Sequence, residues 1–273
     1  EGFPIRPLYT ALDALPEPPL PGSWPFIRGA DAHRDVLAGW KVAETFPAAG
    51  WGGAVADGNA AVLTALSDGV SALVLRVGEG GVAPADLDRL LEGVYLELAP
   101  VIVDAGAEFT AAAEAVLALV AGADDAKRAA MSIDLGADPL TAPLADRAAP
   151  SAGEVVAVAA KLAGRPGVRA VTVDGPALHN RGANAAWELA GALGAAVDYV
   201  RLLVDAGLDV SDALRQISFR LVADDDFRNT TTGHTGVRLT ALSEGGFVPQ
   251  PRPMMKAYAM AAPMADSNCT TLR

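Results

Sequence analysis

The sequence is short of cysteine and of long apolar runs, and both shortages limit what the chain can be. Cys269 is the only cysteine among the 273 residues, which excludes an intrachain disulfide and fits a reducing compartment. No stretch reaches about 18 consecutive apolar residues, and residues 1–8 lack the basic and apolar blocks of a signal peptide. We therefore expect a cytoplasmic protein that does not interact with membranes.

Basic residues are also scarce, with 21 Lys and Arg against 33 Asp and Glu, a formal net charge of −12. An acidic chain without a basic patch is a poor partner for nucleic acid, and it attracts phosphate-bearing ligands weakly. No Cys/His cluster has metal-ligand spacing, and no Gly-x-Ser-x-Gly elbow or Walker loop is present. With 51% apolar residues, the chain can nevertheless bury the core of one large domain.

Aromatic residues make up only 5% of the chain, and several gather with proline in residues 1–58. This segment contains Trp24, Phe26, Trp40 and Trp51 and shows no steady hydrophobic period, which predicts an extended arm followed by a short helix over residues 32–43. Because exposed aromatic side chains are unfavourable in water, the arm either wraps its own domain or clasps a partner.

Residues 59–227 alternate between strand-like and helix-like patterns, as in βα repeats. The predicted strands are residues 72–77, 100–103, 131–135, 168–173 and 217–222, and the predicted helices are residues 86–91, 111–120, 151–162 and 184–204. Ser151 and Glu154 have the spacing of a capping box.

The fold class predicted from these repeats is α/β, either an open doubly wound sheet or an eight-stranded (β/α)8 TIM-type barrel. Five strands precede residue 223 and a sixth is a candidate at residues 255–260, so a barrel of this length is expected to be incomplete. Residues 228–273 have little periodicity and are expected to form a loop-rich tail.

One local motif points to a nucleotide. Gly78 and Gly80 open a Gly-Glu-Gly-Gly-Val-Ala turn after a predicted strand, and Asp104 ends the next strand, as in a dinucleotide-binding fingerprint. The alternative function is thus a stand-alone NAD(P)-binding oxidoreductase of the Rossmann type. Glu79 opposes this interpretation, since it places a negative charge where phosphate would approach.

Other candidate residues are histidines and carboxylates at predicted strand ends. Asp104, Asp134 and Asp174 would converge if their strands are parallel neighbours, where mutual repulsion could raise one pKa, although capping of the next helix is the commoner role. His179 follows the fourth predicted strand and could act as a general acid, or simply bond the nearby loop. His33 lies in an Asp-x-His start like that of cobalt-ligating motifs, but the position that needs glycine holds valine.

Several stretches in the same order resemble the small subunit of methylmalonyl-CoA mutase. Three of them are Pro-Ile-Arg-Pro-Leu-Tyr-Thr at residues 4–10, Pro-Gly-Ser-Trp-Pro-Phe-Ile-Arg-Gly at residues 21–29 and His-Asn-Arg-Gly-Ala-Asn-Ala-Ala-Trp-Glu-Leu at residues 179–189. The others are residues 68–73, 135–140, 199–201 and 216–220. The resemblance covers roughly residues 4–227. It implies a (β/α)8 barrel followed by a cobalamin-type domain, which is not recognisable in this sequence.

The same resemblance implies a heterodimer in which the large subunit binds adenosylcobalamin and the acyl-CoA and converts methylmalonyl-CoA to succinyl-CoA. The large subunit's Gly-Tyr-His-Met-Gln-Glu-Ala-Gly-Ala is similar to residues 175–183, where its catalytic histidine aligns with Ala177 and His179 aligns with glutamine. Alanine cannot donate a proton. Where the large subunit has an aromatic run that contacts the substrate, this chain has residues 30–34. Where the large subunit has a long loop with further substrate contacts, this chain has only residues 141–150. We therefore expect no catalytic, cofactor-binding or metal residue on this chain.

Overall fold

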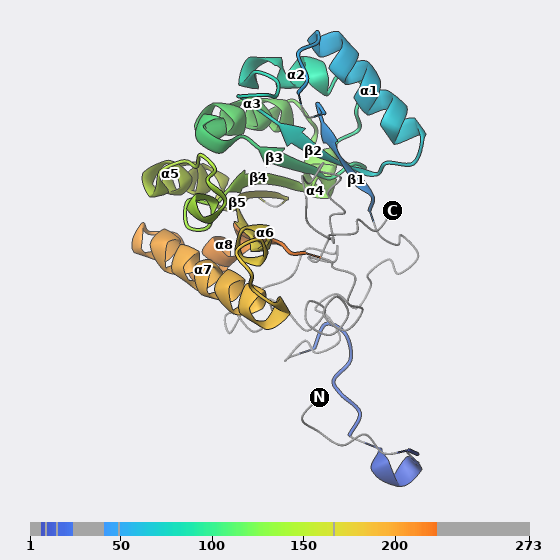
Figure 1. Ribbon diagram of the computed structural model, residues 1–273, viewed down its shortest axis with the longest axis vertical. Coiled ribbons are helices and arrows are strands. Elements are labelled where there is room, and N and C mark those ends of the chain that lie inside the picture. Colours follow the sequence, from blue (N-terminus) through green and yellow to red (C-terminus); the bar gives the residue numbers. More distant parts are fainter. Residues whose placement is uncertain are drawn as a thin grey trace.

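One parallel sheet organises the chain. The computed structural model describes residues 7–8, 10–14, 16–23, 41–48, 50–165 and 167–222. Its six strands lie side by side in sequence order, all parallel (Figure 1). They are β1 (Ala43–Phe46), β2 (Ala72–Arg76), β3 (Val101–Asp104), β4 (Ile133–Ala137), β5 (Val168–Asp174) and β6 (Ile217–Arg220). This confirms an α/β fold with a parallel sheet.

Helices connect successive strands. The longer ones are α1 (Val55–Ser67), α3 (Phe109–Ala121), α5 (Ala152–Leu162) and α7 (Ala185–Asp205). The short ones are α2 (Leu87–Leu90), α4 (Asp125–Ala130), α6 (Gly175–His179) and α8 (Val210–Arg215), and 3-10 turns are η1 (Ala11–Asp13), η2 (Pro84–Asp86), η3 (Gly106–Glu108) and η4 (Ala142–Ala145). In the described part of the chain no helix is both long enough and apolar enough to cross a bilayer.

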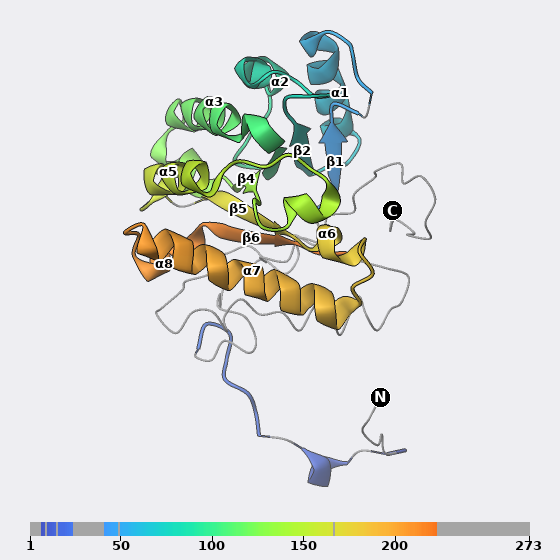
Figure 2. The same ribbon diagram turned by 60° about the vertical axis from the view of Figure 1, so that its left-hand side comes forward.

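The longer helices α1, α3, α5 and α7 form an arc over one face of the curved sheet (Figures 1 and 2). Alternate strand residues such as Leu75, Val103 and Val173 point to that face and pack against helix residues such as Phe109 and Val155 in the main core. The opposite face has a small apolar cluster, with Val74 and Ile102 among its members. Burial against the helices therefore accounts for most of the hydrophobic stabilisation of the described fold.

Two predicted boundaries were wrong. Residues 1–58 were assigned to an arm, but Ala43–Phe46 forms strand β1, and Ala43, the last residue of the predicted 32–43 helix, begins it. The third predicted strand, at 131–135, lies two residues later, at Ile133–Ala137. A four-residue strand next to a proline-rich segment carries too few residues for a period to be recognised.

The predicted helix starts agree closely with the structure. Ser151 Oγ accepts a hydrogen bond from Glu154 N (3.3 Å), and Glu154 Oε2 accepts one from Ser151 N (2.8 Å), so the capping box of α5 is confirmed. The bond from the Ser151 amide is the main cause that lowers the pKa of Glu154. The remaining division into an arm, repeats and a tail stays a prediction, because residues 32–40, 255–260 and all of 228–273 lie outside the described residues.

Gly136 is the residue that lets β4 bend. The register between β4 and β5 shifts between Asp134 and Ala137, and Gly136 has φ +78° within this irregularity. A Cβ atom there would lie 2.0 Å from Val103 O on the neighbouring strand. Only glycine can hold the two strands this close while the chain turns left-handed.

We expect Gly136→Ala to lower the free energy of unfolding by about 2 kcal/mol more than Gly164→Ala does. Gly164 also has a positive φ, +72°, but a Cβ atom there meets nothing within 4 Å. Gly164→Ala therefore measures the cost of the backbone strain without the cost of a steric clash. Urea unfolding followed by circular dichroism measures both. Equal losses in the two variants would show that the close approach to Val103 O is not needed.

Candidate functional site

Charged side chains end the strands of the sheet at its carboxyl edge. Arg76, Asp104, Asp174 and Arg220 are the last residues of β2, β3, β5 and β6. Side chains alternate between faces along a strand, so these four share the face opposite the helices with Val74 and Ile102. Ligands of parallel α/β folds bind at this edge, which makes it the candidate site.

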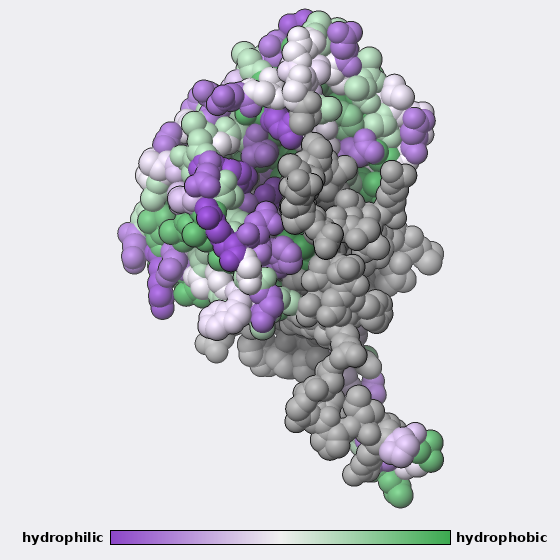
Figure 3. All heavy atoms as spheres, viewed as in Figure 1, coloured by the Kyte–Doolittle hydropathy of each residue, from purple (hydrophilic) through white to green (hydrophobic). Residues whose placement is uncertain are grey.

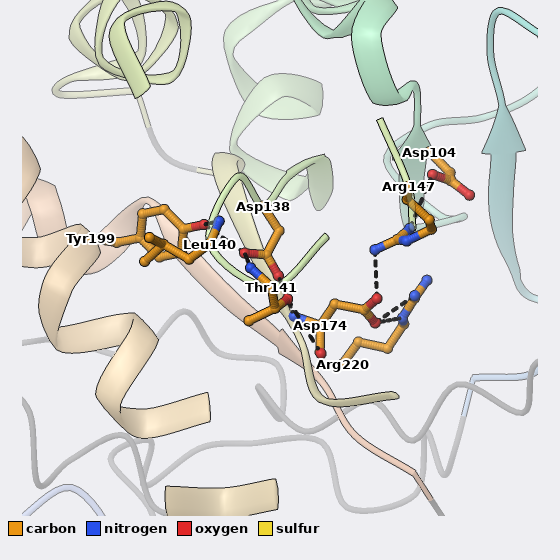
Figure 4. Close-up of polar contacts among 8 residues, drawn as sticks. All are labelled: Asp104, Asp138, Leu140, Thr141, Arg147, Asp174, Tyr199 and Arg220. Carbon is orange, nitrogen blue, oxygen red and sulfur yellow. Dashed lines mark hydrogen bonds and ion pairs between the residues drawn. The ribbon is translucent and has the colours of Figure 1, made fainter. Parts of the chain in front are cut away.

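Asp138, which directly follows β4, is the most heavily bonded side chain at this edge (Figure 4). Its Oδ1 accepts hydrogen bonds from Tyr199 Oη (2.5 Å) and Thr141 N (3.1 Å). Its Oδ2 accepts bonds from Asp174 N (2.8 Å) and the Thr141 hydroxyl. Tyr199 Oη in turn accepts a bond from Leu140 N (2.9 Å). The carboxylate thus connects the loop after β4, the end of β5 and helix α7.

Burial is the main cause that raises the pKa of Tyr199, and the charge of Asp138 and the hydrogen bond to it act in the same direction. Tyr199 is completely buried on α7. Its hydroxyl therefore stays protonated and donates to Asp138. This group holds the site together and is not a candidate for proton transfer at neutral pH.

Asp174 lies between two arginines (Figure 4). Its Oδ1 accepts from Arg220 Nε (2.6 Å) and Nη2 (2.5 Å), and its Oδ2 accepts from Arg147 Nη2 (2.5 Å). Arg147 also approaches Asp104, with Nη1 3.6 Å from Oδ1. The predicted convergence of Asp104 and Asp174 is therefore realised through Arg147, a cation between them, and not by direct repulsion between two carboxylates.

The third predicted carboxylate, Asp134, is not at this edge. It is the second residue of β4, buried, and its carboxylate forms an ion pair with Arg169 of β5. Arg169 also donates to Ser132 Oγ (3.1 Å). The expectation was wrong because the strand begins two residues later than predicted, which places Asp138 at the end of β4. The Gly-Ala-Asp-Pro sequence after the apolar run was the available signal for Asp138.

The glycine turn after β2 does not form a phosphate cradle. The amides of Gly78, Gly81 and Val82 donate to backbone carbonyls of Val82, Gly78 and Arg76, at 2.8, 2.9 and 3.0 Å. A phosphate-binding loop keeps such amides free for its ligand. The turn leads into η2 and the four-residue helix α2, and Asp104 is engaged by Arg147. These contacts give no support to the nucleotide-binding interpretation of this motif.

Of the three histidines, His179 is within the described residues, whereas His33 and His234 are not. His179 ends α6, with Nδ1 3.4 Å from the Oε2 atom of Glu188 on α7. Glu188 is completely buried, and its Oε1 accepts a bond from Val222 N (2.9 Å). Ala177 is buried on the same short helix. His179 thus packs against the end of the sheet, and no contact joins it to Asp174 among the described residues.

Comparison with known proteins identifies related sequences over most of the chain. A family model described as methylmalonyl-CoA mutase matches residues 1–231. A probable methylmalonyl-CoA mutase small subunit of Mycobacterium bovis is 66% identical over 226 residues, which cover 83% of this chain and 36% of that protein.

More distant relatives have the same description. The methylmalonyl-CoA mutase small subunit of Streptomyces virginiae is 42% identical over 231 residues, and that of Propionibacterium freudenreichii is 33% identical over 236 residues. Each match covers 83% of this chain and 36% or 35% of the relative. The chain therefore spans about a third of the length of the relatives it matches.

The Tyr199 hydroxyl should contribute measurably to stability. Tyr199→Phe removes the donor to Asp138 and the acceptor for the Leu140 amide, and leaving such buried groups unpaired costs about 1–3 kcal/mol. We expect this loss in the free energy of urea unfolding. Tyr95→Phe is the matched control, since Tyr95 is 66% exposed. If the two variants were equally stable, the Asp138 network would not support the fold.

Proposed function

The chain belongs to the methylmalonyl-CoA mutase family, and we propose that it forms part of the small subunit of such an enzyme. The observation that carries the proposal is the 66% identity, over 226 residues, to a relative named as a small subunit. The 42% and 33% identical relatives share that name. No described contact favours an oxidoreductase, because the glycine turn bonds to itself.

The proposed reaction is the adenosylcobalamin-dependent interconversion of methylmalonyl-CoA and succinyl-CoA, in a cytoplasmic heterodimer with a large subunit. We propose that the large subunit holds the cofactor. A protein ligates the cobalt of cobalamin through one imidazole, and His179, the one histidine among the described residues, has its Nδ1 3.4 Å from the carboxylate of Glu188. We propose that the residues of this chain contribute support and not chemistry.

Three features support a non-catalytic role. Ala177 is in the position where the resemblance aligns the large subunit's histidine, and it is buried, so no proton donor is available there. Arg147 and Arg220 both bind Asp174 at the edge where a substrate would otherwise enter. The loop that contributes Arg147 is the short one, residues 141–150. Ion pairs within the chain thus occupy the region where the catalytic subunit is expected to contact its substrate.

We also propose that the sheet is an arc of a (β/α)8 barrel. A doubly wound sheet reverses its strand order at a switch point and carries helices on both faces. Here the described strands run in unbroken order from β1 to β6, and the longer helices α1, α3, α5 and α7 lie on one face. A barrel is wound in this way.

The proline-rich N-terminal segment is proposed to clasp the large subunit. Its leucines are exposed to solvent, Leu8 by 72%, Leu12 by 98% and Leu20 by 69%, and Figure 3 shows hydrophobic surface on this segment. A capping box between Thr10 and Asp13 shapes the η1 turn beside Leu12. Apolar side chains held outward in this way are typical of surfaces that bind another protein. Trp24 and Phe26, the first candidates for this role, lie outside the described residues.

The central experiment is to purify this chain with the mutase large subunit and to assay each alone, and both together, with adenosylcobalamin. We expect a stable complex whose mutase activity requires the large subunit, and no turnover by this chain alone. His179→Ala in this chain should leave the activity of the complex unchanged. Turnover by the isolated chain, or a large loss in the His179 variant, would contradict a purely supporting role.

The arm is tested by exchanging Leu8 and Leu12 together for Ser. Removal of two anchors that become buried in the complex should weaken association by about tenfold or more, measured by calorimetry. Leu98→Ser is the matched control, because Leu98 is 65% exposed but lies in the loop before β3. If the variant with both leucines exchanged bound the large subunit with unchanged affinity, Leu8 and Leu12 would not be part of the clasp.

A further inference from the structure

Three arginines gather at the carboxyl edge of the sheet. Arg76 and Arg220 end β2 and β6, and Arg147 reaches the same edge from the loop that follows η4. Arg147 lies between the ends of β3 and β5, since it contacts both Asp104 and Asp174 (Figure 4). The ends of four strands, β2, β3, β5 and β6, and the loop after η4 therefore place guanidinium and carboxylate groups on one edge.

The hydrogen-bonding capacity of these arginines is only partly used. A guanidinium has five N–H donors, and Arg147 makes one short contact, to Asp174 at 2.5 Å, and one long contact, to Asp104 at 3.6 Å. Arg147 Nε is buried and has no hydrogen-bond partner among the described residues. A buried donor without an acceptor is unfavourable, and the Arg147 side chain as a whole is 35% exposed, so a ligand can still reach part of this side chain.

Arg76 adds a second positive group with spare donors. The acceptor that the structure shows for its side chain is the carbonyl oxygen of Pro47, at 3.3 Å, which is neutral. Arg76 is the register partner of Asp104, whose side chain is 40% exposed. Three arginines thus share this edge with Asp104, Asp174 and the nearby Asp138, so the edge is close to neutral. A ligand would be held by hydrogen-bond geometry more than by net charge.

The buried carboxylate of Asp174 keeps two of these guanidinium groups in place. It is 3% exposed and bonds Arg220 through one oxygen and Arg147 through the other. Guanidinium groups that are held in advance bind the paired oxygens of carboxylates and phosphates well, because their planar N–H pairs match that geometry. The carboxyl edge of a parallel sheet is also where such ligands bind in α/β folds.

We propose that Arg147, together with Arg220 and Arg76, forms a binding site for a small oxyanion, a ligand that carries a carboxylate or phosphate group. The site has no catalytic role, and it does not depend on the proposed mutase function, since it rests on contacts within this chain. Its ligand could be a free anion or the charged end of a larger molecule.

The test is calorimetric titration of the full chain with inorganic phosphate and, separately, with malonate, at constant ionic strength in chloride. We expect saturable binding of at least one of them. Binding of phosphate alone would identify a phosphate site, binding of malonate alone a carboxylate site, and binding of both a shared oxyanion site. Absence of saturable binding of either anion would overturn the proposal.

Arg147→Gln should weaken this binding by about tenfold or more, because one charge-assisted hydrogen bond contributes that much. Arg165→Gln, an exposed arginine beyond α5, is the matched control and should bind as the unchanged chain does. Equal affinity in the Arg147 variant and the unchanged chain would refute the assignment.

A second variant keeps the test decisive if Arg147→Gln folds poorly. Asp104→Asn removes the carboxylate that competes for Arg147 while keeping the size of the side chain, so it should tighten anion binding. Weaker binding in Asp104→Asn would count against the proposed site. Circular dichroism of each variant establishes that it retains the fold before titration.

Discussion

The buried carboxylate of Asp138 is the interaction on which the carboxyl edge of the sheet depends. It accepts hydrogen bonds from the Tyr199 hydroxyl, the Thr141 amide and hydroxyl, and the Asp174 amide. A charge that is 3% exposed is tolerated only when donors surround it. Because these donors come from α7, the loop after β4 and the end of β5, the carboxylate fixes where Asp174 and its arginines lie.

The charged groups at this edge are largely paired with one another. A catalytic edge needs groups that are free to meet a substrate, whereas here Asp174 is bound by Arg147 and Arg220, and Ala177 offers no polar atom. Membership in the methylmalonyl-CoA mutase family explains the sheet and its helices. In the supporting role proposed for this chain, the subunit keeps the fold, and internal ion pairs stand where substrate contacts are expected. Oxyanion binding remains compatible with such a subunit, because binding needs donors and not a proton transfer.

Local patterns predicted the elements that are long or strongly marked. Four of the predicted helices, five of the predicted strands to within about two residues, and the capping box at Ser151 agree with the structure, because each depends on neighbours close in sequence. Strand β1 was missed because its four residues are stabilised by pairing with β2, a contact between segments far apart in the chain. The boundary of β4 was misplaced because Gly136 and its bulge carry the strand beyond the apolar run.

The amino-acid sequence by itself determined the α/β fold class and the family resemblance, since these follow from residue identity and order. Tertiary structure alone decided the partners of the charged groups. No spacing in the sequence indicates that Arg147 separates Asp104 from Asp174, or that Tyr199 lies over Asp138, 61 residues away. Such contacts depend on which strands become neighbours and on where each strand ends. Strand β4 ends at Ala137 and not at residue 135, which places Asp138, and not Asp134, at the edge of the sheet.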